Sequence, residues 1–248
     1  MAGHSQFKNI MHRKGAQDRK KAKVFNKIGR EISIAVKQSG EDSTTNAKLR
    51  AAIISARAVN MPNDRVQRAI KSALGDGADA SEEIRYEGYG PGGVALIIEA
   101  LTDNRNRTAP EIRTVMGKHG GNLGETNSVA FQFKRLGQIY YPSTIGSPDA
   151  VFEAAVEVGA DNVESDKDGH SIETTIEDYS TILEKMIEKF GSPEESGFIW
   201  QPINTVPIAG DQAASLMKML NALDELDDVQ QVFGNYDMDT ALMEKLSA

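Results

Sequence analysis

Hydrophobic residues recur every three or four positions through the first third of the chain, which is the spacing of one face of an α-helix. This spacing predicts three amphipathic helices, over residues 18–39, 46–60 and 64–74. On the first of them the apolar face is formed by Val24, Ile28, Ile32, Ala35 and Val36. Gly40 and Met61-Pro62 mark the ends of the first two helices. Together the three helices predict a small helical domain.

Beyond residue 81 the pattern changes to the alternation of apolar and polar positions that is typical of strands. Alternation predicts strands over residues 83–89 and 128–134, and the apolar run over 94–101 predicts a buried strand. A further strand is expected over 229–233, and helices are expected over 106–119 and 211–223. Residues 138–201 follow the order βαββαβ, which is the ferredoxin-like arrangement. The strand at 229–233 has no complete sheet of its own, so we expect it to pair with the earlier strands.

These elements predict an α+β multidomain fold in which an N-terminal three-helix domain precedes two α/β domains. The ferredoxin-like domain is the last of the two and is inserted in the middle one. The expected boundaries are residues 1–75 for the basic helical domain with an arm that is mobile until bound, 81–136 with 204–236 for the split middle domain, 137–203 for the inserted acidic domain, and 237–248 for a tail.

Charge is distributed very unevenly over these segments. Residues 1–75 hold 16 Lys and Arg against 5 Asp and Glu, whereas residues 76–248 hold 12 against 31. A basic segment beside acidic domains predicts a polyanionic partner, because Lys and Arg neutralise phosphates and release counterions. The predicted nucleic-acid-binding residues are Lys8, His12, Arg13, Lys14, Arg19, Lys20, Lys21, Lys23, Lys27 and Arg30. The alternative is a lysine-rich helical face that only keeps the chain in solution.

Motifs for other chemistry are weak. The chain has no cysteine, and its four histidines lie in different segments without metal-ligand spacing. Gly88 to Gly93 matches G-x-G-x-x-G, but a strand rather than a helix follows it, which favours a turn over a dinucleotide site. Glu164, Asp166 and Asp168 resemble the start of a calcium loop, but Thr175 stands where a bidentate Glu is needed. We therefore expect no metal, no cofactor and no enzymatic activity.

The N-terminus has no signal-peptide pattern, and the longest apolar run is too short to span a bilayer. These observations predict a cytoplasmic protein without a membrane partner. The sequence specifies no oligomeric state.

One further segment carries candidate chemistry. Residues 102–108 end a buried strand and open a helix, so they place arginines and amides at a helix N-terminus, where an anion can bind. The candidate anion or partner site consists of Asn104, Arg105, Asn106 and Arg107. An N-cap with solvated arginines is the alternative, and both interpretations stay open at this point.

Several of these segments resemble the YebC/PmpR family. The resemblance is carried by Gly3-His4-Ser5, His12-Arg13-Lys14, Met61-Pro62, residues 86–93, residues 99–108 and residues 118–124. It covers nearly the whole chain, with Gln6-Phe7 in place of a usual Lys-Trp pair. It implies a helical domain and two α/β domains around a cleft, in a protein associated with nucleic acid. Members are described as DNA-binding transcriptional regulators or as translational activators at the ribosome.

We therefore expect a non-enzymatic regulator of gene expression that binds DNA through the basic N-terminal domain. The first alternative is a ribosome-associated translation factor that binds rRNA or tRNA. The second is an adaptor whose basic arm binds an acidic protein surface. A third is a hydrolase or transferase that uses Arg105, Arg107 and His119.

Overall fold

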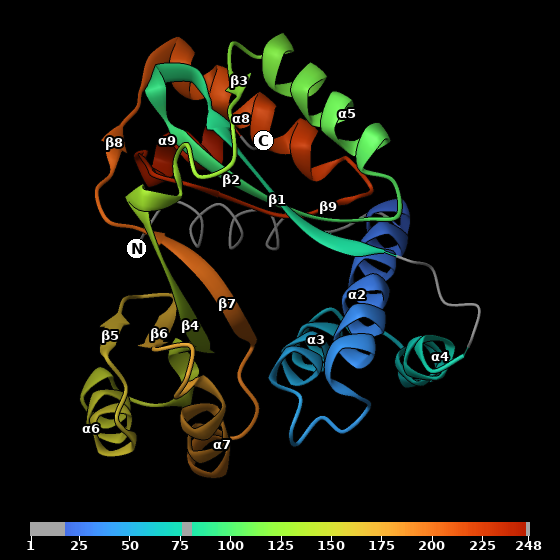
Figure 1. Ribbon diagram of the computed structural model, residues 1–248. Coiled ribbons are helices and arrows are strands. Elements are labelled where there is room, and N and C mark those ends of the chain that lie inside the picture. Colours follow the sequence, from blue (N-terminus) through green and yellow to red (C-terminus); the bar gives the residue numbers. More distant parts are fainter. Residues whose placement is uncertain (1–17, 76–80, 247–248) are drawn as a thin grey trace. The chain divides into compact units, whose positions relative to one another are not determined.

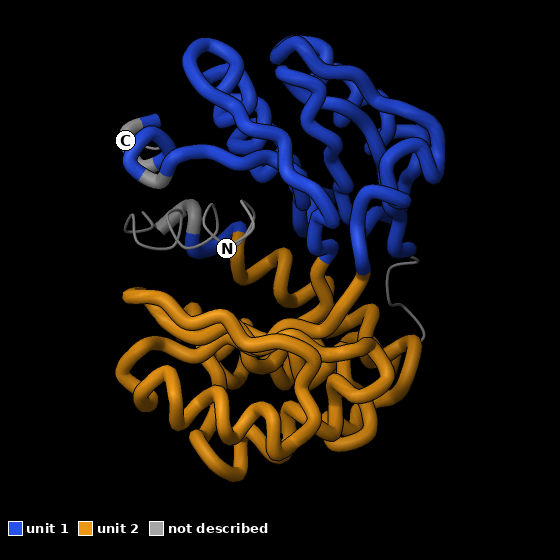
Figure 2. Tube along the Cα trace, turned by 90° about the vertical axis from the view of Figure 1, so that its left-hand side faces the viewer, with its two compact units in different colours: residues 1–23, 79–134, 200–248 blue, residues 24–78, 135–199 orange. Residues whose placement is uncertain are grey.

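The computed structural model describes residues 18–75 and 81–246, which belong to two compact units (Figure 2). One unit contains residues 1–23, 79–134 and 200–248, and the other contains residues 24–78 and 135–199. The helices are α2 (Asp18–Ser39), α3 (Ala47–Ala58), α4 (Asn63–Ala73), α5 (Arg105–Lys118), α6 (Pro148–Val158), α7 (Tyr179–Phe190), α8 (Gly210–Asp224) and α9 (Thr240–Leu246). The strands are β1 (Glu82–Tyr89), β2 (Ala95–Thr102), β3 (Asn122–Leu123), β4 (Phe133–Pro142), β5 (Asn162–Ser165), β6 (Gly169–Thr174), β7 (Glu195–Pro202), β8 (Val206–Pro207), β9 (Val229–Gly234) and β10 (Tyr236–Asp237). Short 3₁₀ turns are η1 (Pro91–Gly93), η2 (Ala130–Gln132) and η3 (Ser143–Ile145).

The first unit is built on an antiparallel sheet with the strand order β3-β1-β2-β9. Strand β9 pairs with β2, with Phe233 opposite Ile97, so the predicted pairing of the last strand with the earlier strands is confirmed. Helices α5 and α8 cover one face of this sheet (Figure 1). Leu96 and Ile98 on β2 point to the same face because side chains alternate along a strand, and both are fully buried against the helices. Helix α9 adds Met243 to this core.

The glycine-rich segment lies between two antiparallel strands. Strand β1 ends at Tyr89, η1 follows, and β2 returns from Ala95 with Tyr89 opposite Ala95. Gly92 and Gly93 have φ angles of 74° and 76°, which side chains with a Cβ rarely adopt. The glycines therefore serve a turn, as the sequence predicted, and no helix opens behind them.

The second unit contains a sheet with the strand order β5-β6-β4-β7, covered by α6 and α7. This order, with one helix after β4 and one after β6, is that of the ferredoxin-like fold. The predicted hairpin joins β5 to β6, and Asp166 Oδ1 accepts hydrogen bonds from the N–H groups of Asp168 and Gly169. This carboxylate therefore stabilises a turn.

Helices α2, α3 and α4 share a core in which Ile32, Leu49 and Ala56 are fully buried. Asn46 caps α3, because its Oδ1 accepts the N–H of Leu49 at 3.0 Å and its Nδ2 donates to the carbonyls of Ala35 and Gly40. The C-terminal end of α2 is thereby tied to the start of α3.

Helix α3 has a second buried face that the sequence analysis did not single out. Ile54 is 4% exposed and packs in the core of the ferredoxin-like unit rather than in that of the three helices. One helical turn earlier, Arg50 Nη1 lies 2.8 Å from Glu184 Oε1 on α7. The three helices and the second sheet therefore form one compact unit through α3.

The structure confirms the α+β fold class, with helices first and strand-containing segments after them. The boundaries of three separate domains stay a prediction. Within residues 18–75 and 81–246, no helix combines the length and the apolar character needed to cross a bilayer.

Candidate nucleic-acid interface and the polar network at the start of α5

Only part of the predicted basic surface can be located. Lys8, His12, Arg13 and Lys14 lie outside the described residues. Arg19 and Lys20 lie in the first turn of α2, where the backbone alone is described. Lys21 is exposed on the same helix, and Lys27 and Arg30 are half-buried further along it. The structure thus brings Lys21, Lys23, Lys27 and Arg30 onto one helix, as the sequence predicted.

Lys23 is engaged by acidic residues. Its Nζ lies 3.2 Å from Glu225 Oε2 and 3.7 Å from Asp227 Oδ1, and it also donates to the backbone carbonyl of Glu225. A bound phosphate would compete with these carboxylates for the ammonium group. These carboxylates therefore weaken Lys23 as a phosphate ligand.

Helices α3 and α4 add cations that the sequence analysis left out of its predicted site. Arg57, Arg65 and Lys71 are exposed, and Arg68 is exposed but paired with Asp64 at 2.6 Å. The guanidinium of Arg65 lies 5.4 Å from the centre of the Phe25 ring on α2, which orients α4 against α2. Arg57 and Lys71 also stabilise their own helices, because they lie in the last turns of α3 and α4, where the helix dipole favours positive charge. Lys37 does the same in the last turn of α2.

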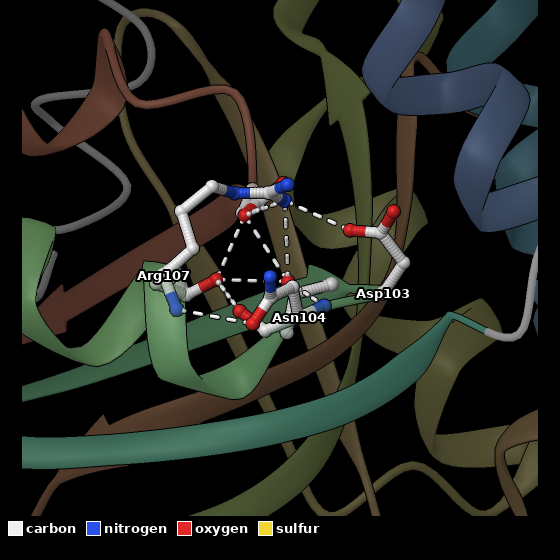
Figure 3. A network of polar contacts seen from close by, with 6 residues as sticks. Asp103, Asn104 and Arg107 are labelled. Carbon is white, nitrogen blue, oxygen red and sulfur yellow. Dashed lines mark hydrogen bonds and ion pairs between the residues drawn. The ribbon is translucent and has the colours of Figure 1, made fainter.

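The second candidate site lies at the start of α5, in the first unit. Asn104 is the N-cap residue, and its Oδ1 accepts the N–H of Arg107 at 3.2 Å. Thr102, the last residue of β2, accepts the N–H of Asn104 through its hydroxyl at 2.9 Å. Figure 3 shows Asp103, Asn104 and Arg107 converging at this helix end. The strand-to-helix turn is therefore held by side chains from both elements.

Arg107 lies over this turn and is bound by two carboxylates. Its Nη2 lies 2.7 Å from Asp228 Oδ2 and 2.9 Å from Asp103 Oδ1. The same oxygen of Asp228 accepts the hydroxyl of Thr108 at 2.7 Å and that of Thr102 at 3.1 Å. Asp228 is 4% exposed and immediately precedes β9, so the network joins residues far apart in sequence.

The electrostatics of this network follow from its hydrogen bonds. Burial alone raises the pKa of the Asp228 carboxyl, but hydrogen bonds from Arg107, Thr108 and Thr102 outweigh burial, so the pKa lies below its ordinary value. Hydrogen bonding to Asp228, and then to Asp103, raises the pKa of Arg107. Both partners are therefore charged at neutral pH.

The rest of the predicted anion site is open to solvent. Arg105 and Asn106 are exposed, and Arg105 Nε lies 3.5 Å from Glu82 Oε1. His119 is the C-cap residue of α5, so it lies about 18 Å along the helix from Arg107. Because this distance is too large for one reaction centre, the geometry does not support a hydrolase or transferase built from Arg105, Arg107 and His119.

A second buried carboxylate, Glu87, was missed by the sequence analysis. It is 1% exposed on β1 and accepts hydrogen bonds from the N–H groups of Asn127, Val129 and Ala130 at 2.8 to 3.0 Å. Arg85 Nε lies 2.9 Å from its Oε1. Burial raises the pKa of Glu87, and these three hydrogen bonds and Arg85 outweigh that effect and lower it. The sequence held one indication of this buried carboxylate, which is that Glu87 lies within the alternating strand pattern of residues 83–89.

Two family models match the chain. The first, described as the TACO1/YebC protein N-terminal domain, matches residues 5–76. The second, described as the TACO1/YebC second and third domain, matches residues 81–236. The chain belongs to the TACO1/YebC family. The resemblance found in the sequence is thereby confirmed.

A solved structure extends this result. The crystal structure of a conserved hypothetical protein from Aquifex aeolicus is 43% identical in sequence and matches with a TM-score of 0.82. The match covers 90% of this chain and 92% of that chain. The α+β fold described above is therefore a fold of the TACO1/YebC family.

Proposed function

We propose that the chain is a cytoplasmic, nucleic-acid-binding regulator of gene expression that holds phosphate groups with residues 1–75 and acts without catalysing a reaction. The observation that carries the proposal is the charge split, with 16 basic and 5 acidic residues before residue 76 and 12 against 31 after it. The family model that matches residues 81–236 also bears a name for transcriptional regulation.

The described helices support this proposal. Lys21 on α2, Arg57 on α3 and Lys71 on α4 are all exposed. The ferredoxin-like segment 137–203 holds 3 basic and 14 acidic residues, so phosphate is repelled from it. A polyanion is therefore attracted to one end of the chain, and the acidic segments restrict how it can bind.

Promoter DNA is the first target of the proposal, and structured RNA at the ribosome is the second. Reading a DNA sequence requires side chains that hydrogen-bond to base edges in a groove. The polar face of α2 carries mainly Lys, including Lys20, Lys21 and Lys27, which suits contacts with the phosphate backbone. This observation favours structured RNA or DNA binding of low sequence specificity.

A salt titration tests the proposal. Six to eight phosphate contacts on duplex DNA give a slope of about −5 to −7 in a plot of log affinity against log salt concentration. The fluorescence anisotropy of labelled duplex DNA and of labelled rRNA fragments measures both slopes on the full chain. A slope near zero for both would refute the proposal and leave the protein adaptor as the better interpretation.

Charge reversal locates the contacts. Replacing Lys20, Lys21 and Lys27 together by Glu is expected to abolish binding, because these positions carry the predicted phosphate ligands on α2. A matched control reverses Lys167, Lys185 and Lys189, which are exposed on the acidic segment, and these substitutions are expected to leave affinity unchanged. Equal losses from both sets of substitutions would show that net charge alone, and not the basic segment, governs binding.

A further inference from the structure

One aromatic ring of the first unit is left in solvent by the fold. Phe131 in η2 is 72% exposed, the largest exposed fraction among the large apolar residues that the structure describes. Ile203, which is 51% exposed, belongs to a segment that pairs with η2, because its N–H donates to the carbonyl of Gln132 at 2.9 Å. Two chain segments of the first unit that are joined by a backbone hydrogen bond thus each carry an exposed apolar side chain.

The ring is held in place by a buried anchor. The carboxylate of Glu87 accepts the N–H groups of Val129 and Ala130, each at 2.8 Å, directly before Phe131. Directly after it, the N–H of Gln132 donates to the carbonyl of Val129 at 2.9 Å. The backbone on both sides of Phe131 is therefore fixed by hydrogen bonds. An exposed ring on a fixed backbone loses little conformational entropy when it binds a partner, which favours binding.

Local charge indicates what kind of partner fits. Segments 126–138 and 200–210 contain no Asp or Glu, and they contain Lys134 and Arg135, whereas the chain after residue 75 holds 31 acidic residues. Lys134 is exposed three residues after Phe131. Two carboxylates of the first sheet are paired, since Glu99 Oε1 accepts Trp200 Nε1 at 2.8 Å and Glu87 pairs with Arg85. The surroundings of the ring therefore complement an anionic partner.

We propose that Phe131 stacks on an unpaired base of a bound nucleic-acid strand, with Lys134 beside the phosphate of that strand. The inference rests on the proposed function and adds a second contact to it, outside the basic segment. Aromatic side chains stack on bases of any identity, because every base has a π-face. A base in a continuous duplex is already stacked, so the contact selects single strands, loops and bulges.

Binding of oligonucleotides to the full chain tests the inference. The probes are a labelled single-stranded RNA, a single-stranded DNA of the same sequence, and the blunt DNA duplex. Phe131→Ala is expected to weaken binding of the single strands about tenfold and to change duplex binding less than about twofold. Phe131→Trp keeps a stacking surface and is expected to retain affinity. A 2-aminopurine base in the strand reports stacking directly, because its fluorescence is quenched by the wild type and not by Phe131→Ala.

The matched control is Phe152→Ala, which removes a phenylalanine that is 55% exposed on α6 in the acidic segment. It is expected to change no affinity. If the wild type binds neither strand nor duplex, the proposed function and this inference both fail. If the wild type binds and Phe131→Ala retains full affinity for single strands, only this inference fails, and the ring is assigned to a pocket on a protein partner.

Discussion

The guanidinium of Arg107 lies 2.7 Å from the carboxylate of Asp228, although 121 residues separate them in the chain. This pair joins the first turn of α5 to the residue before β9, and Thr102 and Thr108 also donate hydrogen bonds to Asp228. The arginine that the sequence offered as an anion ligand is thus neutralised from within the protein.

Removing Asp228 is expected to destabilise the first unit. Asp228→Ala leaves the hydroxyls of Thr102 and Thr108 without their buried acceptor, so the free energy of unfolding should fall by about 2–3 kcal/mol. Urea denaturation measures this loss. Asp103→Ala is the matched control, because it removes the exposed carboxylate bound to the same arginine and should cost less than about 0.5 kcal/mol. Equal losses from both variants would contradict the structural role assigned to Asp228.

Stability should depend on pH through Glu87 and Asp228. The folded-state pKa of each carboxyl lies below its ordinary value of about 4. As the pH falls, the unfolded chain therefore binds more protons than the folded chain. Their contribution is complete above about pH 5.5, well above the unfolded-state pKa values, and is lost as the pH falls through the lowered folded-state values. Unfolding free energies measured from pH 7 to pH 3 should decline less steeply in Glu87→Gln than in the wild type. Glu125→Gln, at an exposed position, should reproduce the wild-type curve.

Because α3 packs against the ferredoxin-like sheet, we expect the three helices and that sheet to lose stability together. Ile54→Ala removes a side chain that is 4% exposed in that core, and should lower the free energy of unfolding by about 2–4 kcal/mol. Because α3 belongs to both cores, hydrogen exchange should accelerate in α2 and in β6 together. Ile176→Ala, which is 42% exposed, should leave exchange unchanged. Faster exchange in the three helices alone would show that the two parts fold independently.

A substitution in the glycine-rich turn should lower stability through backbone strain and not through a steric clash. A Cβ added at Gly93 meets nothing within 4 Å, but the φ of 76° is strained for any residue with a side chain. Gly93→Ala should therefore cost about 1 kcal/mol, and Gly93→Asn less, because Asn tolerates left-handed conformations. Gly197 has the same open space and no positive φ, so Gly197→Ala should not destabilise the chain. Thermal denaturation distinguishes the three variants.

Local patterns predicted the local elements well. The spacing of Ile28, Ile32 and Val36 specified the buried face of α2, and Gly40 ends that helix with a φ of 83°. The nearly continuous apolar run over residues 94–101 predicted a buried strand, and β2 is buried along its length except at Glu99. The joining of β9 to the earlier strands also followed, because a lone strand must find a sheet to satisfy its backbone, whereas its partner β2 was known only from the structure.

The partners of the polar side chains could not be predicted in this way. Nothing near Arg107 in the sequence points to Asp228, and nothing near Glu87 points to the N–H groups of residues 127–130. Ile54 lies within a helical pattern whose other members face a different core. Each of these contacts depends on how helices and strands pack after they form.

The sequence alone determined the charge split, the helices and strands, and the turn at Gly92-Gly93, because these properties depend on residues close together in the chain. The tertiary structure decided that Arg107 is bound by Asp228 and that Glu87 holds the backbone under an exposed Phe131. The physical reason is that a buried charge requires a partner, and the fold supplies that partner from whichever segment packing brings within hydrogen-bonding distance.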